Sequence, residues 1–304
     1  MIRLVECVPN FSEGRNRDLM EDVCAVIEAV AEARVLDLHM DADHNRSVVT
    51  FVAPPEAIVE AAVCATKRAA ELIDVSQHTG EHPRMGATDV LPFVPLGSVM
   101  MGECVALAHE AGERIARELG IPVFFYGAAA RKIERRNLED VRRGGFERLR
   151  EEISANSMRR PDEFAGDVPR VHMTAGACIV GARDILIAYN VNLQTDDLSI
   201  ARDIARAVRA RDGGLPAVKA LGLRLRTRRI VQVSMNLIDY RVTGIHELFA
   251  AVEREASKRS VGIAGSEIVG LTPRAALDPE HIESLRLESE RRDFFIEDRI
   301  GAAF

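Results

Sequence analysis

The sequence predicts an α/β protein of the mixed α+β kind, with two ferredoxin-like halves that each follow the order β-α-β-β-α-β. Short apolar runs typical of strands alternate with segments of helical spacing along the chain. The same order of elements occurs twice, and each half opens on a strand that runs into asparagine, at Asn10 and at Asn190 with Asn192. We therefore expect subdomains at residues 1–183 and 184–304, with facing sheets and a ligand groove between them.

Apolar spacing and the Gly and Pro residues define the elements of the first half. Pro9-Asn10 ends the opening strand, and Pro54-Pro55 opens a helix in its first turn, where proline is tolerated. A long loop rich in Pro, Gly and Asp follows at residues 155–176. Before that loop, the predicted elements are strand 2–8, helix 19–30, strands 34–38 and 46–52, helix 54–73, strand 89–94, helix 102–119, strand 121–126 and a charged helix 129–153.

The second half repeats this pattern over fewer residues. A basic turn at residues 224–229 connects two of its strands, and we interpret it as a solvated hairpin. The predicted elements are strand 185–191, helix 200–211, a hairpin of strands 221–225 and 230–237, helix 245–256 and strand 261–269.

Composition excludes several classes of function. The net charge is −7, aromatic residues make up 5% of the chain and tryptophan is absent, so no nucleic-acid partner is expected. The five cysteines are widely spaced and form no C-x-x-C pair, which is typical of reduced thiols in the cytoplasm. The sequence has neither the layout of a signal peptide nor an apolar run long enough for a membrane helix, so we expect a cytoplasmic protein.

A polar segment rich in glycine and proline, residues 78–89, reads His-Thr-Gly-Glu-His-Pro-Arg-Met-Gly-Ala-Thr-Asp. His78, Glu81 and His82 match the H-x-x-E-H zinc motif, but the glycine and proline disfavour the helix that this motif needs. One alternative is that a histidine performs general acid–base chemistry. The other is that it has only a structural role and fastens the loop by a hydrogen bond. The residues alone do not choose between His78 and His82.

A second polar cluster, residues 41–46, lies between two predicted strands. Asn45 and Arg46 could hold a substrate carboxylate, because arginine offers a planar fork of donors. A simple turn, which Asp and Asn favour, explains the cluster equally well. The asparagines at the strand ends, Asn10, Asn190 and Asn192, fit either a shared ligand groove or turns that bond their own backbone.

The sequence resembles the formiminotransferase domain family along nearly its whole length, in a stand-alone form without a cyclodeaminase domain. The block Gly-Glu-His-Pro-Arg-Met-Gly-Ala at residues 80–87 is the most specific match. The other matching segments are residues 4–14, 45–46 with 50–52, 125–127, 181–183 with 186–188, and 242–244.

This resemblance implies a homodimer with a folate tunnel between two α/β subdomains and no metal. It implies glutamate formimidoyltransferase activity, in which tetrahydrofolate, as co-substrate, accepts a formimino group from N-formimino-L-glutamate in histidine degradation. It implies that His82 is the catalytic base and that Arg46 and Arg84 are candidates for substrate carboxylates. A folate-contacting loop would end at Met173, Thr174, Ala175 and Gly176. N-formylglutamate as donor, or a folate-binding protein without turnover, are the alternatives.

Overall fold

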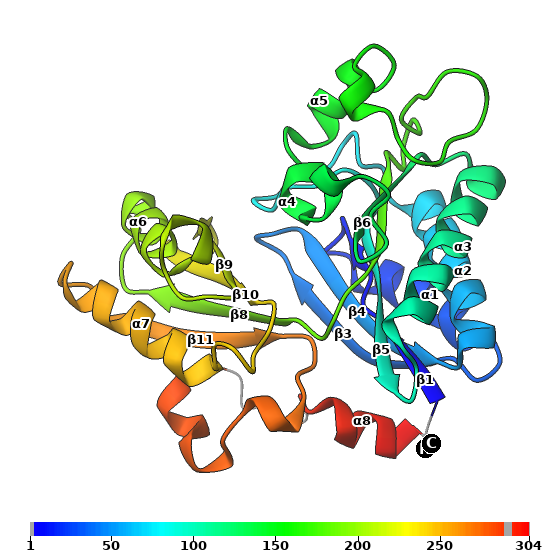
Figure 1. Cartoon of the computed structure of the whole chain (residues 1–304). Helices are drawn as coiled ribbons and strands as arrows, with labels where there is room; N and C mark the ends of the chain where they lie inside the picture. Colours follow the sequence, from blue (N-terminus) through cyan, green and yellow to red (C-terminus); the bar gives the residue numbers. More distant parts are fainter. Residues whose placement is uncertain (1–2, 289–293, 304) are drawn as a thin grey trace. The chain divides into compact units, whose positions relative to one another are not determined.

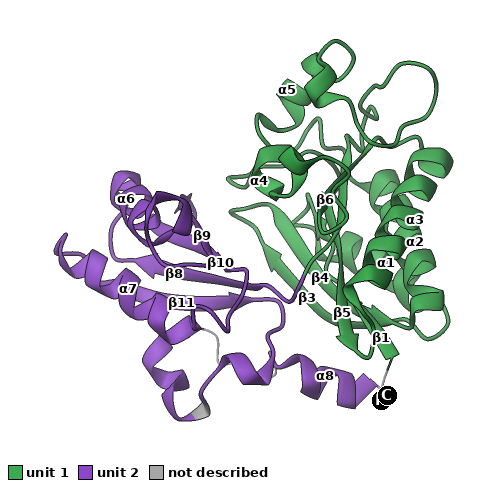
Figure 2. Ribbon diagram, viewed as in Figure 1, with its two compact units in different colours: residues 1–183 green, residues 184–304 purple. Residues whose placement is uncertain are grey.

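The computed structural model describes residues 3–288 and 294–303 of the chain, which forms two compact units, residues 1–183 and 184–304 (Figures 1 and 2). Each unit contains one β-sheet with helices packed on it, as expected for a mixed α/β fold.

The sheet of the first unit has a ferredoxin-like centre. Strand β1 lies between β4 and β5, β3 pairs with β4, and all these neighbours are antiparallel. The short strand β2 pairs with β4 and β5, while β7 and then β6 extend the sheet beyond β5 in parallel. The strands are β1 (Arg3–Cys7), β2 (Asn10–Phe11), β3 (Arg34–Asp41), β4 (Arg46–Ala53), β5 (Thr88–Gly97), β6 (Val123–Gly127) and β7 (Cys178–Ala182).

Three helices cover one face of this sheet: α1 (Arg17–Glu28), α2 (Pro55–Leu72) and α3 (Met101–Leu119) (Figure 1). The side chain of Asn16 caps α1 by accepting from the Leu19 N–H, α2 begins at Pro55, and Gly120 ends α3 in the left-handed conformation. The apolar stripes of these helices meet the sheet in the main core, where buried Ile, Leu and Phe side chains contribute about 1.5–3 kcal/mol each.

The sheet of the second unit has the strand order β11-β8-β10-β9, entirely antiparallel. Its first strand again lies between its third and fourth, which is the same order as β3-β4-β1-β5 in the first unit. The predicted repeat is therefore confirmed. The elements are β8 (Ile187–Leu193), α6 (Leu198–Val208), η3 (Ala210–Asp212), β9 (Val218–Leu225), β10 (Ile230–Leu237), α7 (Ile245–Ser257), β11 (Ile263–Val269), η4 (Arg274–Ala276), η5 (Pro279–Leu285) and α8 (Ile296–Ala303).

The prediction of one long charged helix at residues 129–153 is wrong. The segment forms three short helices, η1 (Ile133–Arg135), α4 (Leu138–Val141) and α5 (Gly145–Glu152). Gly144 and Gly145 both have positive φ, 86° and 66°, which no continuous right-handed helix accommodates. The segment covers a second apolar cluster, made by β5, β6 and β7 with side chains of α4 and α5, and η2 (Ser157–Arg159) follows it.

The strand β7 was not predicted, although it lies inside the sheet between β5 and the edge strand β6. It has only 5 residues, of which Ile179 and Val180 alone are bulky, and so short an apolar run did not stand out. A Cβ at Gly181 would come within 2.4 Å of the Tyr126 ring, so close packing against β6 requires glycine there.

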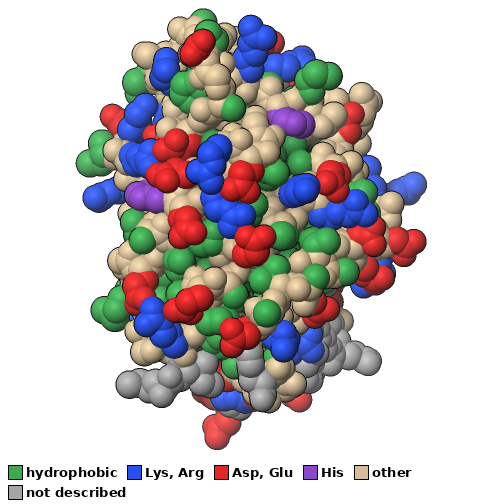
Figure 3. Space-filling view, turned by 90° about the vertical axis from the view of Figure 1, so that its right-hand side faces the viewer, with side chains coloured by type: hydrophobic (Ala, Val, Ile, Leu, Met, Phe, Trp, Pro, Cys, Tyr) green, Lys and Arg blue, Asp and Glu red, His purple; other side chains and the backbone are tan. Residues whose placement is uncertain are grey.

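The distribution of surface charges and the state of the cysteines agree with the expectations from composition. Acidic and basic side chains are interspersed on the face drawn in Figure 3. All five cysteines are free, and Cys7, Cys104 and Cys178 are buried. Within the described part of the chain, no helix is both long and apolar enough to cross a membrane.

Close contact between β9 and α6 makes a clear stability prediction. A Cβ at Gly222 would lie 2.4 Å from the Arg202 backbone nitrogen and 2.6 Å from the Ala201 carbonyl carbon. We expect Gly222→Ala to lower the free energy of unfolding by about 1–3 kcal/mol, because backbone atoms must move. Gly301→Ala in α8 meets no atom within 4 Å and is the control, unchanged or up to about 1 kcal/mol more stable. Urea unfolding measures both, and equal stabilities would contradict the packing argument.

Candidate active site

The segment before β5 lines a small polar cavity of about 10 Å³ within the first unit. No helix forms between residues 77 and 87, so the two histidines of the segment do not share a helical face. The cavity is lined by Phe11, Ser12, His44, Asn45, Arg46, His78, His82, Pro83, Arg84 and Asp89. Four of the predicted site residues therefore meet here: Asn45, Arg46, His82 and Arg84.

Backbone hydrogen bonds hold this irregular segment against the loop that ends at Gly176. The Ala87 N–H donates to the Ala175 carbonyl at 2.9 Å, and the Ala177 N–H donates to the Met85 carbonyl at 3.0 Å. A Cβ at Gly86 would lie 2.1 Å from the Ala177 carbonyl oxygen, so only glycine allows the two backbones to approach this closely. The most specific block of the sequence is thus positioned by a loop about 90 residues further along the chain.

Hydrogen bonds at His82 define which of its ring nitrogens can accept a proton. His82 Nδ1 lies 2.8 Å from the Pro83 carbonyl oxygen, which can only accept, so Nδ1 is assigned as the donor. The remaining lone pair is on Nε2. Nη1 of Arg46 contacts both ring nitrogens, lying 2.6 Å from Nδ1 and also against Nε2. His82 is therefore a neutral imidazole whose free lone pair faces a guanidinium.

Burial lowers the pKa of His82 well below its ordinary value, and the positive charges of Arg46 and Arg142 lower it further. The His82 contact with the Pro83 carbonyl opposes this shift, whereas His44 adds a small lowering effect. A depressed pKa keeps the ring in its basic form at neutral pH, which a general base requires.

The cavity has more positive than negative charge. The Asp89 carboxylate accepts from Arg142 at 2.6 Å and from the Met85 N–H at 2.7 Å, and both acidic and basic side chains of this pair are buried. Arg46 is left without a carboxylate among the described residues, and its Nε has no hydrogen-bond partner there. Burial and the charge of Arg142 lower the pKa of Arg46 to about 9. The arrangement attracts an anion.

Three predicted residues fasten the loops in this structure. His78 Nε2 lies 2.7 Å from the Asn45 carbonyl oxygen, while the Asn45 amide accepts from the Gly14 N–H and donates to the Thr79 carbonyl. Arg84 pairs with Glu147 at 2.8 Å and donates to two backbone carbonyls. The polar turn at residues 41–46 thus has a structural purpose, and Arg46 is the member whose side chain faces His82.

The predicted folate loop lies beside the same segment. The Thr174 carbonyl accepts from the Val75 N–H at 2.8 Å, and Gly176 has φ 70° where the loop turns back on His172. The Met173 side chain is 86% exposed and Ala175 is buried. Asn10, in β2, donates to the Val8 carbonyl at 2.9 Å, so its amide stabilises a turn of the backbone.

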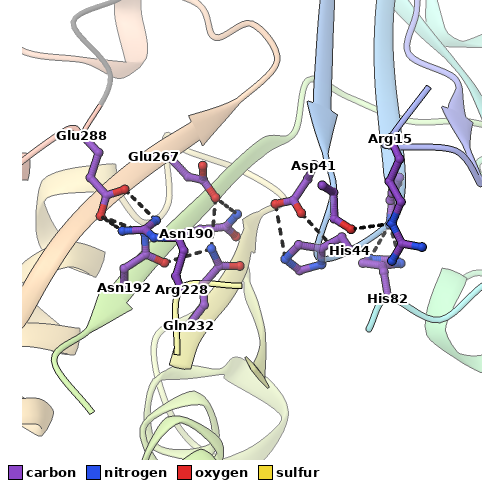
Figure 4. A network of polar contacts seen from close by, with 12 residues as sticks. Arg15, Asp41, His44, His82, Asn190, Asn192, Arg228, Gln232, Glu267 and Glu288 are labelled. Atoms are coloured by element: carbon purple, nitrogen blue, oxygen red, sulfur yellow. Dashed lines mark hydrogen bonds and ion pairs between the residues drawn. The ribbon is translucent and has the colours of Figure 1, made fainter. Parts of the chain in front are cut away.

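Asn190 and Asn192 belong to a polar network on the sheet of the second unit, which Figure 4 shows from close by. Both asparagine amides donate to carboxylates, that of Asn190 to Glu267 at 2.8 Å and that of Asn192 to Glu288 at 3.1 Å. Gln232, which is fully buried, donates to Glu267 and Asn192. From the predicted basic turn, Arg228 forms a two-pronged ion pair with Glu288.

Sequence reasoning missed several charged groups. Arg142 and Asp89 were not recognised as a buried pair, since they are 53 residues apart. Glu6 was read as part of an apolar run, but burial raises its carboxyl pKa to about 7, with Arg183 opposing the rise. A signal existed in the second unit: Asn190, Asn192 and Gln232 occupy strand positions where alternation places them on one face.

A metal centre has no support in the geometry. Within residues 3–288 and 294–303, no three His, Cys, Asp or Glu side chains gather in a way that could hold an ion. His78 is committed to the Asn45 carbonyl, and His82 to Pro83 and Arg46.

Fold and site together define a two-unit α/β protein with a polar cavity in which an imidazole lies against a guanidinium. Comparison with known families is consistent with this class and narrows it. Residues 4–183 match the formiminotransferase domain, N-terminal subdomain, and residues 188–282 match the formiminotransferase domain. The chain belongs to the formiminotransferase domain family.

Characterised relatives are similar over most of the chain. A glutamate formimidoyltransferase of Thermoplasma acidophilum is 49% identical over 90% of this chain and 89% of its own length. One of Streptococcus pyogenes is 44% identical over 91% of each chain. The formimidoyltransferase-cyclodeaminase of Sus scrofa is 40% identical over 99% of this chain but only 57% of its own length.

The buried pair of Asp89 and Arg142 supports a prediction about the stability of the site. We expect Asp89→Asn to lower the free energy of unfolding by about 3–5 kcal/mol, because it leaves a buried guanidinium without its counter-charge. Asp140→Asn is the matched control: it breaks an exposed pair with Arg143 and should cost no more than about 1 kcal/mol. Chemical denaturation measures both variants, and similar losses would show that burial of the first pair has no energetic consequence.

Proposed function

We propose that the chain is a glutamate formimidoyltransferase, which transfers the formimino group of N-formimino-L-glutamate to tetrahydrofolate in histidine degradation. The products are 5-formiminotetrahydrofolate and L-glutamate. The observation that carries this proposal is the identity of 49% and 44% to two proteins of that name over about nine-tenths of the chain. The proposal includes a cytoplasmic homodimer that uses tetrahydrofolate as co-substrate and needs no metal.

The chemistry demands one proton acceptor in the right protonation state. Nitrogen 5 of the folate attacks the formimino carbon, and a new C–N bond forms while that nitrogen becomes cationic. Its proton must leave, and a proton must reach the glutamate nitrogen as the old C–N bond breaks. His82 is assigned both transfers, because its depressed pKa keeps it neutral at pH 7 and its Nδ1–H bond to Pro83 leaves Nε2 as the acceptor.

The other site residues are assigned to binding. Arg46 suits a substrate carboxylate, since a guanidinium without a counter-charge gains most from an anion. The loop ending at residues 173–176 is assigned to the folate, with the exposed Met173 side chain available for contact. Asn190 and Asn192 offer polar groups on the second unit. Asn10, Asn45 and Arg84 are assigned indirect parts, because their side chains hold the loops around the cavity.

Replacement of His82 tests the catalytic assignment. We expect His82→Ala to lower kcat about 10²- to 10⁴-fold, because a positioned general base contributes that much. The Kd for tetrahydrofolate should change little. His281→Ala, which removes an exposed histidine paired with Asp278, is the control and should retain wild-type turnover. Product absorbance and folate titration give the two quantities, and unchanged kcat in a folded His82→Ala protein would reject the assignment.

A donor panel separates the proposed reaction from its alternatives. The purified protein is given tetrahydrofolate with either N-formimino-L-glutamate or N-formyl-L-glutamate, and the new folate species is followed by absorbance. Turnover with the formimino donor supports the proposal. Turnover only with the formyl donor identifies a formyltransferase. Folate binding without turnover of either donor identifies a folate-binding protein.

A further inference from the structure

Arg46 and His82 cannot both serve the reaction in the arrangement that the structure shows. The Nδ1–H of His82 is committed to the Pro83 carbonyl, so the ring has one lone pair left, on Nε2. Nη1 of Arg46 contacts that nitrogen and also lies 2.6 Å from Nδ1, so the guanidinium lies against the ring over both nitrogens. A guanidinium has donors only and cannot take up or pass on a proton at neutral pH. While Arg46 remains there, the nitrogen that must receive the proton from the folate amine is covered.

Arg46 is also the group in the cavity with the most to gain by moving. Its contact is with a neutral ring, whereas the neighbouring carboxylate, Asp89, is occupied by Arg142 at 2.6 Å and by the Met85 N–H. A carboxylate carries the opposite charge and can accept two parallel bonds from a guanidinium, whereas the neutral ring offers a single lone pair. The half-buried guanidinium of Arg46 forms no ion pair of its own among the described residues, and it therefore prefers an anionic ligand to the imidazole.

We propose that Arg46 is a cap on His82 that a carboxylate of the donor substrate displaces, so that binding of the donor uncovers the catalytic base. The inference rests on the proposed function, since the donor is a glutamate derivative with two carboxylates. The cavity of about 10 Å³ fits this view, because it has no room for a carboxylate until a side chain moves. Arg46 is thereby both the residue that selects an acidic donor and the residue that controls when the base is available.

Displacement has a consequence for protonation that can be measured without turnover. The charges that face His82 come from Arg46 in β4, from Arg142 after α4 and, more weakly, from His44, which lies 3.8 Å from Asp41. Arg142 stays neutralised by Asp89. When Arg46 pairs with a ligand carboxylate, its positive charge no longer opposes protonation of the ring. The pKa of His82 must then rise from its depressed value toward the ordinary range.

The test is a titration of His82 by NMR in protein labelled at the histidine ring, with L-glutamate as the probe. In the free wild-type protein His82 should remain neutral well below pH 6.5, and saturating L-glutamate should raise its pKa. In Arg46→Gln the pKa should already be raised without glutamate, and glutamate should not shift it further. Arg46→Lys keeps a cation and should keep the pKa depressed. Arg117→Gln, an exposed residue of α3, is the control and should behave as wild type.

The KM values of the two substrates give a second test of the role of Arg46. Loss of the charged contact in Arg46→Gln should raise KM for N-formimino-L-glutamate about 10- to 100-fold, as for a hydrogen bond between charged groups. KM for tetrahydrofolate should change far less. The inference is overturned if L-glutamate leaves the wild-type pKa of His82 unchanged, whether it binds elsewhere or not at all. It is equally overturned if folded Arg46→Gln protein retains the depressed value.

The inference and the proposed function fail in different ways. If the protein turns over neither donor, but glutamate raises the pKa of His82 only when Arg46 is present, the inference about Arg46 holds and the proposed reaction is rejected. If formimino transfer is normal but glutamate does not change the pKa of His82, the proposed reaction holds and the inference about Arg46 is rejected.

Discussion

The site depends on one constraint, which is the backbone pairing that fixes the irregular segment before β5. Residues 77–87 have no helix or strand of their own, so nothing local holds His82. The bonds from Ala87 to Ala175 and from Ala177 to Met85 supply that rigidity, and Gly86 and Gly176 permit the approach. Ser12 adds a third anchor through its hydroxyl bond to the Gly86 carbonyl at 2.7 Å. Without these contacts, the ring would have no fixed lone-pair direction.

Charge balance within the cavity follows from the same framework. Two arginines, Arg46 and Arg142, converge on one carboxylate, Asp89, and the pairing leaves one cation in excess. Burial lowers the pKa of His82, the excess positive charge lowers it further, and the same excess attracts an anion. The protein thus keeps a neutral base beside an unsatisfied cation, an arrangement that would be unfavourable in a part of the fold without function.

The second unit differs in how its polar residues are used. On its sheet, the amides of Asn190, Asn192 and Gln232 are all engaged with Glu267, Glu288 or one another. A network satisfied in this way is rigid and specifies side-chain directions. The three amide side chains are buried and paired, whereas the imidazole of His82 lies in the first unit.

Sequence alone determined the order of the elements and singled out the segment that lines the cavity. Helical and strand periodicities are local, so the repeated β-α-β-β-α-β order and the ends of α1, α2 and α3 could be predicted from neighbouring residues. The block at residues 80–87 could be recognised because its residues are contiguous. The Gly144-Gly145 pair that breaks the predicted helix was equally local, but the charged, helix-favouring residues around it outweighed that signal.

Only the tertiary structure decided which partners these residues have. It placed β7 between β5 and β6, where Gly181 allows close packing against Tyr126, which no apolar pattern reveals. It pairs Asp89 with Arg142 and leaves Arg46 in contact with His82. The side chains of His78, Asn45 and Arg84 are engaged in hydrogen bonds that hold the loops. These choices join residues tens of positions apart, and their energies come from burial and the competition for counter-charges, which exist only once the chain is folded.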